Sequence, residues 1–213
     1  MRADRSGAST SVASTAVVGG ADEREGGTME QSVPVRGTIG RRRFLGGFAA
    51  AAALAPISAW AGALGSATRR LSFVNLHTGE NLTAAYWSNG AYERAAVEDI
   101  NHLLRDFRTG EVHPIDLRLL DLLHVLQRGV ESRSPFQVIS GYRSPATNAK
   151  LAAAGGGVAR RSYHMKGMAI DVALADRKLR TLRDAALSLA AGGVGYYPNP
   201  GFVHVDVGPV RSW

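Results

Sequence analysis

The sequence predicts a mixed domain of helices and short strands that follows a separate N-terminal leader. Some segments repeat apolar residues every three or four positions, as amphipathic helices do, and others are short apolar runs bounded by turn residues, as strands are. Both patterns begin only near residue 71. A chain of 213 residues is long enough for one sizeable core, so we expect a single folded domain over residues 71–213.

The leader divides into two parts. Residues 1–40 are rich in Ser, Gly, Thr and charge without a periodic pattern, so we expect a disordered extension, with Met29 as a candidate for the true start. Residues 41–61 resemble a twin-arginine export signal, because RRRFL at 41–45 precedes a short alanine-rich apolar run and a small-x-small cleavage site at 59–61. Export by this route predicts the periplasm or cell-wall space. The alternative is an uncleaved anchor, which would be the only membrane contact.

The composition narrows the possible partners. The formal net charge is +7, but the basic residues are scattered between acidic ones and form no stripe with interleaved aromatic residues, so we expect no nucleic-acid partner. Cysteine is absent, which excludes disulfides and the cysteine of a lipoprotein anchor. We expect a monomer.

The first elements of the domain are predicted to be packing elements. Apolar runs at 73–77 and 81–87 flank Thr-Gly-Glu at 78–80, which indicates a β-hairpin. Residues 92–107 and 116–129 carry apolar residues at helical spacing. Four histidines fall in or between these elements without any matching ligand spacing, so we expect structural roles for them: His77, His102, His113 and His124.

A strand over residues 136–140 leads into a turn that carries Arg143. Ser144 can cap a following helix with Pro145 at its first position, and the triple glycine at 155–157 should end that helix rather than bind phosphate. Arg143 therefore lies at a strand-to-helix turn, where its guanidinium could grip a substrate carboxylate or carbonyl. The alternative for Arg143 is a surface ion pair.

Strand alternation decides which of the later polar residues can meet. In a strand over 168–174, Asp171 faces away from the larger apolar side chains. In a strand over 202–207 the valines share one face, which leaves His204 and Asp206 together on the other.

Two histidines and a carboxylate are the ligands of an open zinc site. His164, in the loop that leads to Asp171, and His204 can supply imidazole nitrogens, and three protein ligands leave a fourth position for a reactive water. An amphipathic helix over 176–191 links the two ligand-bearing strands. From its place beside His204, Asp206 could ligate the metal, act as a general base or orient His204.

These residues resemble those of a known family. The chain is similar to the murein endopeptidase K family, zinc peptidases of the D-Ala-D-Ala carboxypeptidase and Hedgehog type, over residues 71–213. The resemblance implies an α+β fold with a small central antiparallel sheet flanked by helices, Zn²⁺ held by His164, Asp171 and His204, and hydrolysis of peptide cross-links between peptidoglycan peptide stems. Three motifs carry it in order: Gly141-Tyr142-Arg143-Ser144, Ser162-x-His164-x-x-Gly167-x-Ala169-x-Asp171, and Gly193–Pro198 before Phe202–Asp206.

One departure leaves the general base open. Related enzymes place a glutamate three residues before the last zinc histidine, or use another histidine near it, whereas position 201 here is glycine. Strand geometry makes Asp206 our candidate base, with Arg143 stabilising the oxyanion. Asp206→Asn should then keep zinc and lose turnover. Two alternatives are a non-catalytic zinc-containing peptidoglycan-binding module and a metal-free structural wall protein, the second of which conflicts with keeping all three ligand types.

Overall fold

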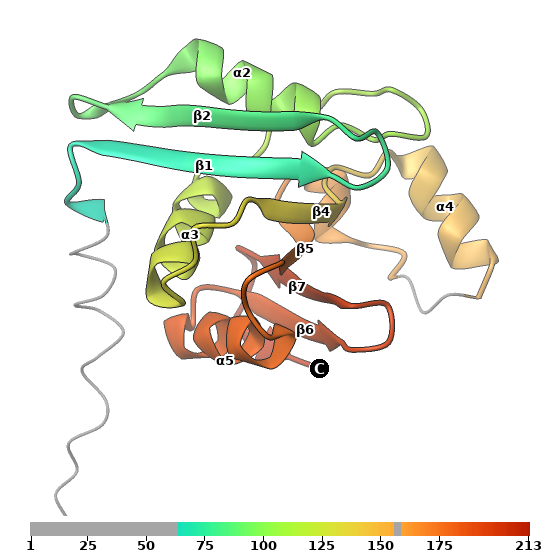
Figure 1. The fold of residues 1–213 in the computed structure, drawn as a ribbon. Coiled ribbons are helices and arrows are strands. Elements are labelled where there is room, and N and C mark those ends of the chain that lie inside the picture. Colours follow the sequence, from blue (N-terminus) through green and yellow to red (C-terminus); the bar gives the residue numbers. More distant parts are fainter. Residues whose placement is uncertain (1–63, 156–158) are drawn as a thin grey trace, which may run out of the picture. The chain divides into compact units, whose positions relative to one another are not determined.

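The computed structural model describes residues 64–155 and 159–213 of the chain. The predicted extension (1–40), the predicted export signal (41–61) and most of the triple glycine lie outside these ranges. Helices and strands are mixed along the described residues, as expected, and the strands form a twisted sheet (Figure 1).

Short runs of strands and helices follow one another along the chain. In the described part of the chain, none of the helices has the length and apolarity needed to cross a membrane. In order, the elements are β1 (Thr68–Asn75), β2 (Asn81–Ser88), β3 (Ala91–Tyr92), α2 (Arg94–Leu103), α3 (Leu117–Gly129), β4 (Phe136–Ser140), α4 (Pro145–Ala153), the 3-10 helix η1 (Tyr163–Lys166), β5 (Ala169–Leu174), α5 (Leu179–Leu189), β6 (Gly193–Tyr197), β7 (Phe202–Asp206) and β8 (Arg211–Ser212).

The sheet is larger than the resemblance implied, and it is mixed. Its eight strands lie in the order β3-β2-β1-β4-β5-β7-β6-β8. Most neighbours are antiparallel, but β1 pairs with β4, and β6 with β8, in parallel. The prediction of a small antiparallel sheet is therefore wrong in size and in strand direction. The chain between β2 and β4 passes through α2 and α3, and this crossover lets β4 enter the sheet in the direction of β1.

The predicted N-terminal hairpin is present as β1 and β2. The strands pair antiparallel up to Val74 opposite Asn81. Asn75 organises the turn, because its side-chain oxygen accepts hydrogen bonds from the backbone N–H groups of His77 and Thr78. Its side-chain amide also donates to the carbonyl of Leu103, which ties the turn to the end of α2.

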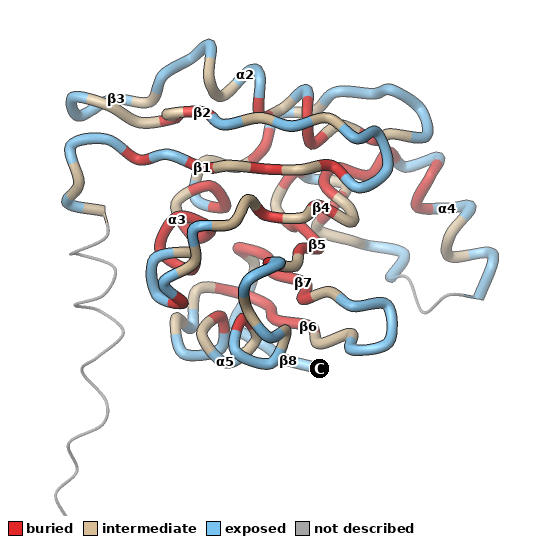
Figure 2. Tube along the Cα trace, viewed as in Figure 1, coloured by how far each residue is buried: buried red, intermediate tan, exposed pale blue. Residues whose placement is uncertain are grey.

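The hydrophobic core lies between the sheet and its helices. Helix α3 packs on β1, α5 packs on β5, β6 and β7, and the two helices contact each other. Alternation supplies the strand side of this core, since Leu71 and Phe73 on β1 and Ile170 and Val172 on β5 are almost completely buried. Buried stretches recur along the central strands in Figure 2. Apolar burial of this kind contributes about 1.5–3 kcal/mol for each large side chain.

Three helices are shorter than their hydrophobic patterns. The patterns over 92–107, 116–129 and 176–191 become α2, α3 and α5. Polar contacts explain the difference at several ends: Asp116 caps α3 by accepting from the N–H of Arg118, and Asp176 accepts from Ser132 before α5 begins. The predicted cap of α4 is confirmed, because Ser144 accepts from Thr147 N–H and Pro145 is the first helical residue.

Register across the sheet places a row of polar residues on the face opposite the core. Asp171 lies opposite Ser140 on one side and opposite His204 on the other, and His204 in turn lies opposite Gly195. Residues paired in this way project from the same face. One row across β4, β5, β7 and β6 therefore brings together groups that are far apart in the sequence.

Candidate metal centre

His164 is presented by η1, which begins and ends with clear local signals. Ser162 caps it by accepting a hydrogen bond from the N–H of His164, and Gly167 ends it at a φ of 64°, where glycine is favoured. The carbonyl of His164 also accepts from the N–H of Arg143 at 3.2 Å. The turn that carries Arg143 is thus joined to the turn that carries His164.

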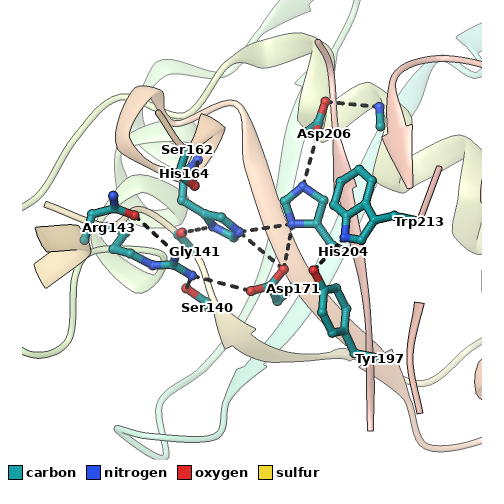
Figure 3. A network of polar contacts seen from close by, with 12 residues as sticks. Ser140, Gly141, Arg143, Ser162, His164, Asp171, Tyr197, His204, Asp206 and Trp213 are labelled. Carbon is teal, nitrogen blue, oxygen red and sulfur yellow. Dashed lines mark hydrogen bonds and ion pairs between the residues drawn. The ribbon is translucent and has the colours of Figure 1, made fainter. Parts of the chain in front are cut away.

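Three potential ligand atoms converge above the polar row. One oxygen of Asp171 lies 2.8 Å from Nδ1 of His204 and 3.3 Å from Nε2 of His164, and the two nitrogens are 3.2 Å apart (Figure 3). All three residues are buried, with exposed fractions of 2% for His164, 5% for Asp171 and 8% for His204. Within the described residues, this is the one cluster of at least three such groups able to hold a metal ion.

Hydrogen bonds behind the two rings decide which nitrogens face the cluster. Nδ1 of His164 lies 2.7 Å from the carbonyl of Gly141, and Nε2 of His204 lies 3.0 Å from a carboxylate oxygen of Asp206. Both partners are pure acceptors, so with a metal bound in the cluster these nitrogens would carry the protons and the other two would present lone pairs. Two lone pairs and one carboxylate oxygen directed at one point fit a divalent cation, because metal-ligating histidines normally donate their second N–H in this way.

The charges of the centre reinforce one another. Burial alone would raise the pKa of Asp171, but the interactions with His164 and His204 outweigh it and hold that pKa well below its ordinary range. Burial would likewise lower the pKa of His204, whereas hydrogen bonds to Asp171 and Asp206 raise it.

Asp206 lies behind the His204 ring rather than in front of it. It is fully buried, and it contacts the nitrogen that faces away from the cluster. One carboxylate oxygen accepts from the N–H groups of Gly193 and Gly208, and Arg211 donates to both oxygens. Burial would raise the pKa of Asp206, but these donors and His204 hold it well below its ordinary range. This placement favours the orienting role over the roles of ligand and base.

Arg143 lies beside the cluster with weak partners. Its guanidinium is 3.7 Å from the second oxygen of Asp171, 3.3 Å from the hydroxyl of Ser140 and 3.4 Å from the side-chain oxygen of Asn148. The side chain is buried at the strand-to-helix turn, so the alternative of a surface ion pair is wrong. Contacts of this length leave the guanidinium free to take a better acceptor.

The cluster opens into a cleft of about 390 Å³. Its lining combines Arg143, Arg161 and Arg211 with four aromatic side chains, and Asp171 is its one acidic residue among those the structure describes. Asp206 is not part of the lining. A cleft of this composition suits an extended, polar ligand that carries negative charge.

The other histidines have structural partners, as expected. His77 stacks on Phe107 with ring centroids 3.8 Å apart, and His113 stacks on Tyr142 at 4.6 Å. His102, near the end of α2, lies beside the guanidinium of Arg105, and His124 is buried at a T-shaped contact with Tyr86. All four lie outside the cleft lining.

Sequence reasoning missed several residues of the cleft lining, two of them at the end of the chain. Arg211 on β8 and the following Trp213 both line the cleft, and Trp213 donates its indole N–H to the hydroxyl of Tyr197 at 2.6 Å. Tyr163, beside His164, lines the cleft as well. The closing segment GPVRSW lies inside the range 71–213 of the family resemblance, and the aromatic pair at 196–197 lies in its third motif; this resemblance was the available signal.

Fold and site together define a class: a mixed α/β domain with a two-histidine, one-carboxylate centre at the floor of an open cleft, as in metallohydrolases. The model of the family described as Peptidoglycan L,D-endopeptidase MepK matches residues 64–213, and the chain belongs to this family. Zinc dependence is a property that membership of the family implies.

Named relatives agree with the family. Peptidoglycan L,D-endopeptidase MepK of Escherichia coli K12 is 45% identical over 169 residues, which cover 79% of this chain and 93% of the relative. The probable peptidoglycan L,D-endopeptidase MepK of Haemophilus influenzae is 40% identical over 170 residues, or 79% and 91%. A crystal structure of Serratia marcescens L-Ala D-Glu endopeptidase ChiX overlaps 43% of this chain and 68% of its own at 23% identity and a TM-score of 0.28, too little to bear on the fold.

Proposed function

We propose that this chain is a zinc-dependent peptidoglycan endopeptidase that hydrolyses L,D bonds in the peptide cross-links of the cell wall. The observation that carries the proposal is the convergence of Nε2 of His164, Nδ1 of His204 and an oxygen of Asp171 at the floor of an open cleft. The curated relatives, which this chain covers almost completely, are named for that activity.

The side chains of the centre have distinct proposed roles. His164, Asp171 and His204 hold the metal, and Asp206 orients the ring of His204. Zinc at such a site supplies Lewis acidity and an activated water. Arg143, whose present contacts are long, binds the substrate carbonyl or a neighbouring carboxylate and stabilises negative charge that develops on the carbonyl oxygen.

The ligand roles can be tested with one variant and one matched control. His164→Ala should lose both bound zinc and hydrolysis of defined cross-linked muropeptides, followed by mass spectrometry. His102→Ala replaces a histidine outside the cleft lining and should keep both. A chelator should abolish cleavage by the wild-type protein, and added zinc should restore it. Full hydrolysis by metal-free protein would refute the proposal.

The same substrates decide between cleavage and binding, and between bond types. The proposal predicts products from muropeptides joined through an L,D bond and none from those joined only through D,D bonds. Zinc-loaded protein that binds sacculi without releasing any muropeptide would instead support the binding module. Cleavage confined to D,D bonds would refute the bond assignment while leaving the peptidase class intact.

We also propose export by the twin-arginine route to the periplasm or cell-wall space, supported by the RRRFL segment at 41–45 and the apolar run behind it. Replacing Arg41 and Arg42 together by lysine should retain the protein in the cytoplasm, as followed by cell fractionation. Unchanged export of this variant would contradict the route. The expected monomer can be checked by light scattering on the exported form.

A further inference from the structure

We infer that Arg211 is a positioning residue for the metal centre: it fixes the Asp206 carboxylate, which in turn fixes the ring of His204 so that Nδ1 faces the metal. The inference rests on the proposed metal-binding function and extends it to β8. Nothing in the ligand pattern points to Arg211, because it contacts none of the three proposed ligands through a hydrogen bond.

The first step is the contact between Arg211 and Asp206. Two guanidinium nitrogens donate to the two carboxylate oxygens, Nη1 to Oδ1 at 3.1 Å and Nη2 to Oδ2 at 2.7 Å. This fork geometry fixes the plane of the carboxylate as well as its position. The Oδ2 atom held in this way is the one that lies 3.0 Å from Nε2 of His204.

The second step is that Arg211 supplies the cation a buried carboxylate requires. Asp206 has no exposed surface, whereas the side chain of Arg211 is 38% exposed. Taking a carboxylate out of water without a partner is costly, so it needs a paired charge and donors to each oxygen. Arg211 thus reaches from the surface to the back of the His204 ring.

The third step is that Arg211 is itself held between aromatic rings. Its guanidinium carbon lies 5.1 Å from the ring centroid of Tyr163 and 5.0 Å from that of Trp213, within the range of cation–π contacts. Trp213 also approaches His204, with centroids 5.3 Å apart. Because Tyr163 precedes His164, this clamp of Tyr163, Arg211 and Trp213 contacts the elements that carry both histidines.

The backbone of β6 is shaped to accept the clamp. A Cβ atom on Gly193 would lie 2.4 Å from Nη1 of Arg211 and 2.5 Å from Oδ2 of Asp206, and one on Gly195 would lie 2.7 Å from the indole of Trp213. A side chain at either position would therefore displace Arg211, Asp206 or Trp213 from these places. Backbone hydrogen bonds from Trp213 to Val194 and from Tyr196 back to Trp213 hold β8 and its following residue against this surface.

The test measures metal binding without substrate. Arg211→Gln should weaken zinc binding about 10- to 100-fold, the usual cost of losing an outer-shell partner, when affinity is measured by chelator competition. In cobalt-substituted protein the same variant should change the visible spectrum, which reports ligand geometry. Arg118→Gln is the matched control, because Arg118 also donates to both oxygens of a single carboxylate, that of Asp116, which has no hydrogen bond to either metal histidine. Its affinity and spectrum should match the wild type.

A double-mutant cycle separates positioning from general damage. If Arg211 acts through Asp206, Arg211→Gln should have little further effect on zinc affinity once Asp206→Asn is present. Arg211→Lys, which keeps the charge but not the fork, should fall between wild type and Arg211→Gln and carries the test if the glutamine variant does not fold.

The outcomes distinguish this inference from the proposed function. Wild-type protein that binds zinc, together with folded Arg211 variants of unchanged affinity and cobalt spectrum, would overturn the inference alone. Fully additive losses from Arg211→Gln and Asp206→Asn would overturn it too, since the two residues would then act separately. Wild-type protein that binds no metal would overturn the proposed function first.

Discussion

Donors occupy both oxygens of the Asp206 carboxylate. Two backbone N–H groups, the Arg211 guanidinium and the His204 ring all donate to it, and none of its surface is exposed. A carboxylate held in this way has a strongly lowered pKa, and Asp206 does not line the cleft where a proton would have to be taken up. Asp206 is therefore suited to orienting the ring of His204.

Asp206→Asn tests this assignment at the scale of one atom. We predict that zinc affinity falls roughly 10- to 100-fold, because the amide cannot hold the His204 ring through a charged acceptor. Metal content after gel filtration and chelator competition would show the loss. A variant that keeps zinc at full affinity but loses hydrolysis would instead support the general-base role inferred from strand alternation.

The position of Asp206 beside His204 could be predicted from the sequence. The hydrogen-bond donors that surround its carboxylate could not. Alternation along a strand puts residues 204 and 206 on one face, and the structure agrees. The donors come from Gly193 on β6 and Arg211 on β8, two short strands without a clear hydrophobic pattern. These two strands pair in parallel and are not joined by a tight turn, so no turn motif in the sequence predicts their pairing.

At the scale of elements, the turn between β4 and α4 determines where Arg143 lies. Asp106, just after α2, accepts from the N–H of Ser144 at 2.9 Å and from that of Arg108 at 2.9 Å. Ser144 in turn caps α4 through Thr147. A loop from another part of the chain therefore fixes the element that carries Arg143.

Asp106→Asn should destabilise the domain in a pH-dependent way. Burial alone would raise the pKa of Asp106, but hydrogen bonds from Thr147, Ser144 and the backbone lower it to about 2. A lowered folded-state pKa adds stability above the ordinary value of 3.8, and that stability is lost as the pH falls through about 2. We predict a loss on the order of 1–2 kcal/mol near neutral pH, measured by urea unfolding.

Unfolding measured at a series of pH values tests whether the charge of Asp106 causes this stabilisation. The difference between wild type and Asp106→Asn should shrink as the pH falls from about 4 to about 2, since the unfolded chain takes up the proton there while the folded carboxylate keeps its charge until about pH 2. Asp184→Asn, at an exposed pair with Arg183, should change stability little at any pH. A gap between wild type and Asp106→Asn that is constant across the series would show that charge is not involved.

Helices and caps were more predictable than the sheet. The hydrophobic patterns located α2, α3 and α5, and the Ser144-Pro145 pair located the start of α4, because these signals are local. Strand order and the parallel pairing of β1 with β4 depend on contacts between distant segments. The family resemblance implied a small antiparallel sheet, which is wrong for this chain.

At the scale of the whole molecule, the metal centre joins separate parts of the chain. The three proposed ligands come from η1, β5 and β7, and the register of β5 with β7 places two of them opposite each other. A metal held by all three binds the folded state and has no comparable site in the unfolded chain. Zinc should therefore act as a global stabiliser.

Zinc removal should lower the melting temperature of the whole domain. At a free zinc concentration about 1,000 times its dissociation constant, the expected stabilisation is about 4 kcal/mol, or roughly 10 °C for a domain of this size. Calorimetry with and without chelator would measure it. His164→Ala should show no zinc-dependent shift; a shift of full size in that variant would place the stabilising ion elsewhere.

The nitrogen that faces the cluster lies at a different distance from the backbone in each histidine, and this decides which residue could replace each one. His204 offers Nδ1, which is two bonds from its Cβ, whereas His164 offers Nε2, which is three bonds away. An asparagine oxygen matches the short distance and a glutamine oxygen the long one. The strand residue and the turn residue are therefore not interchangeable: asparagine is the nearer isostere at position 204 and glutamine at position 164, and a swap of the two would leave one ligand too short and the other too long.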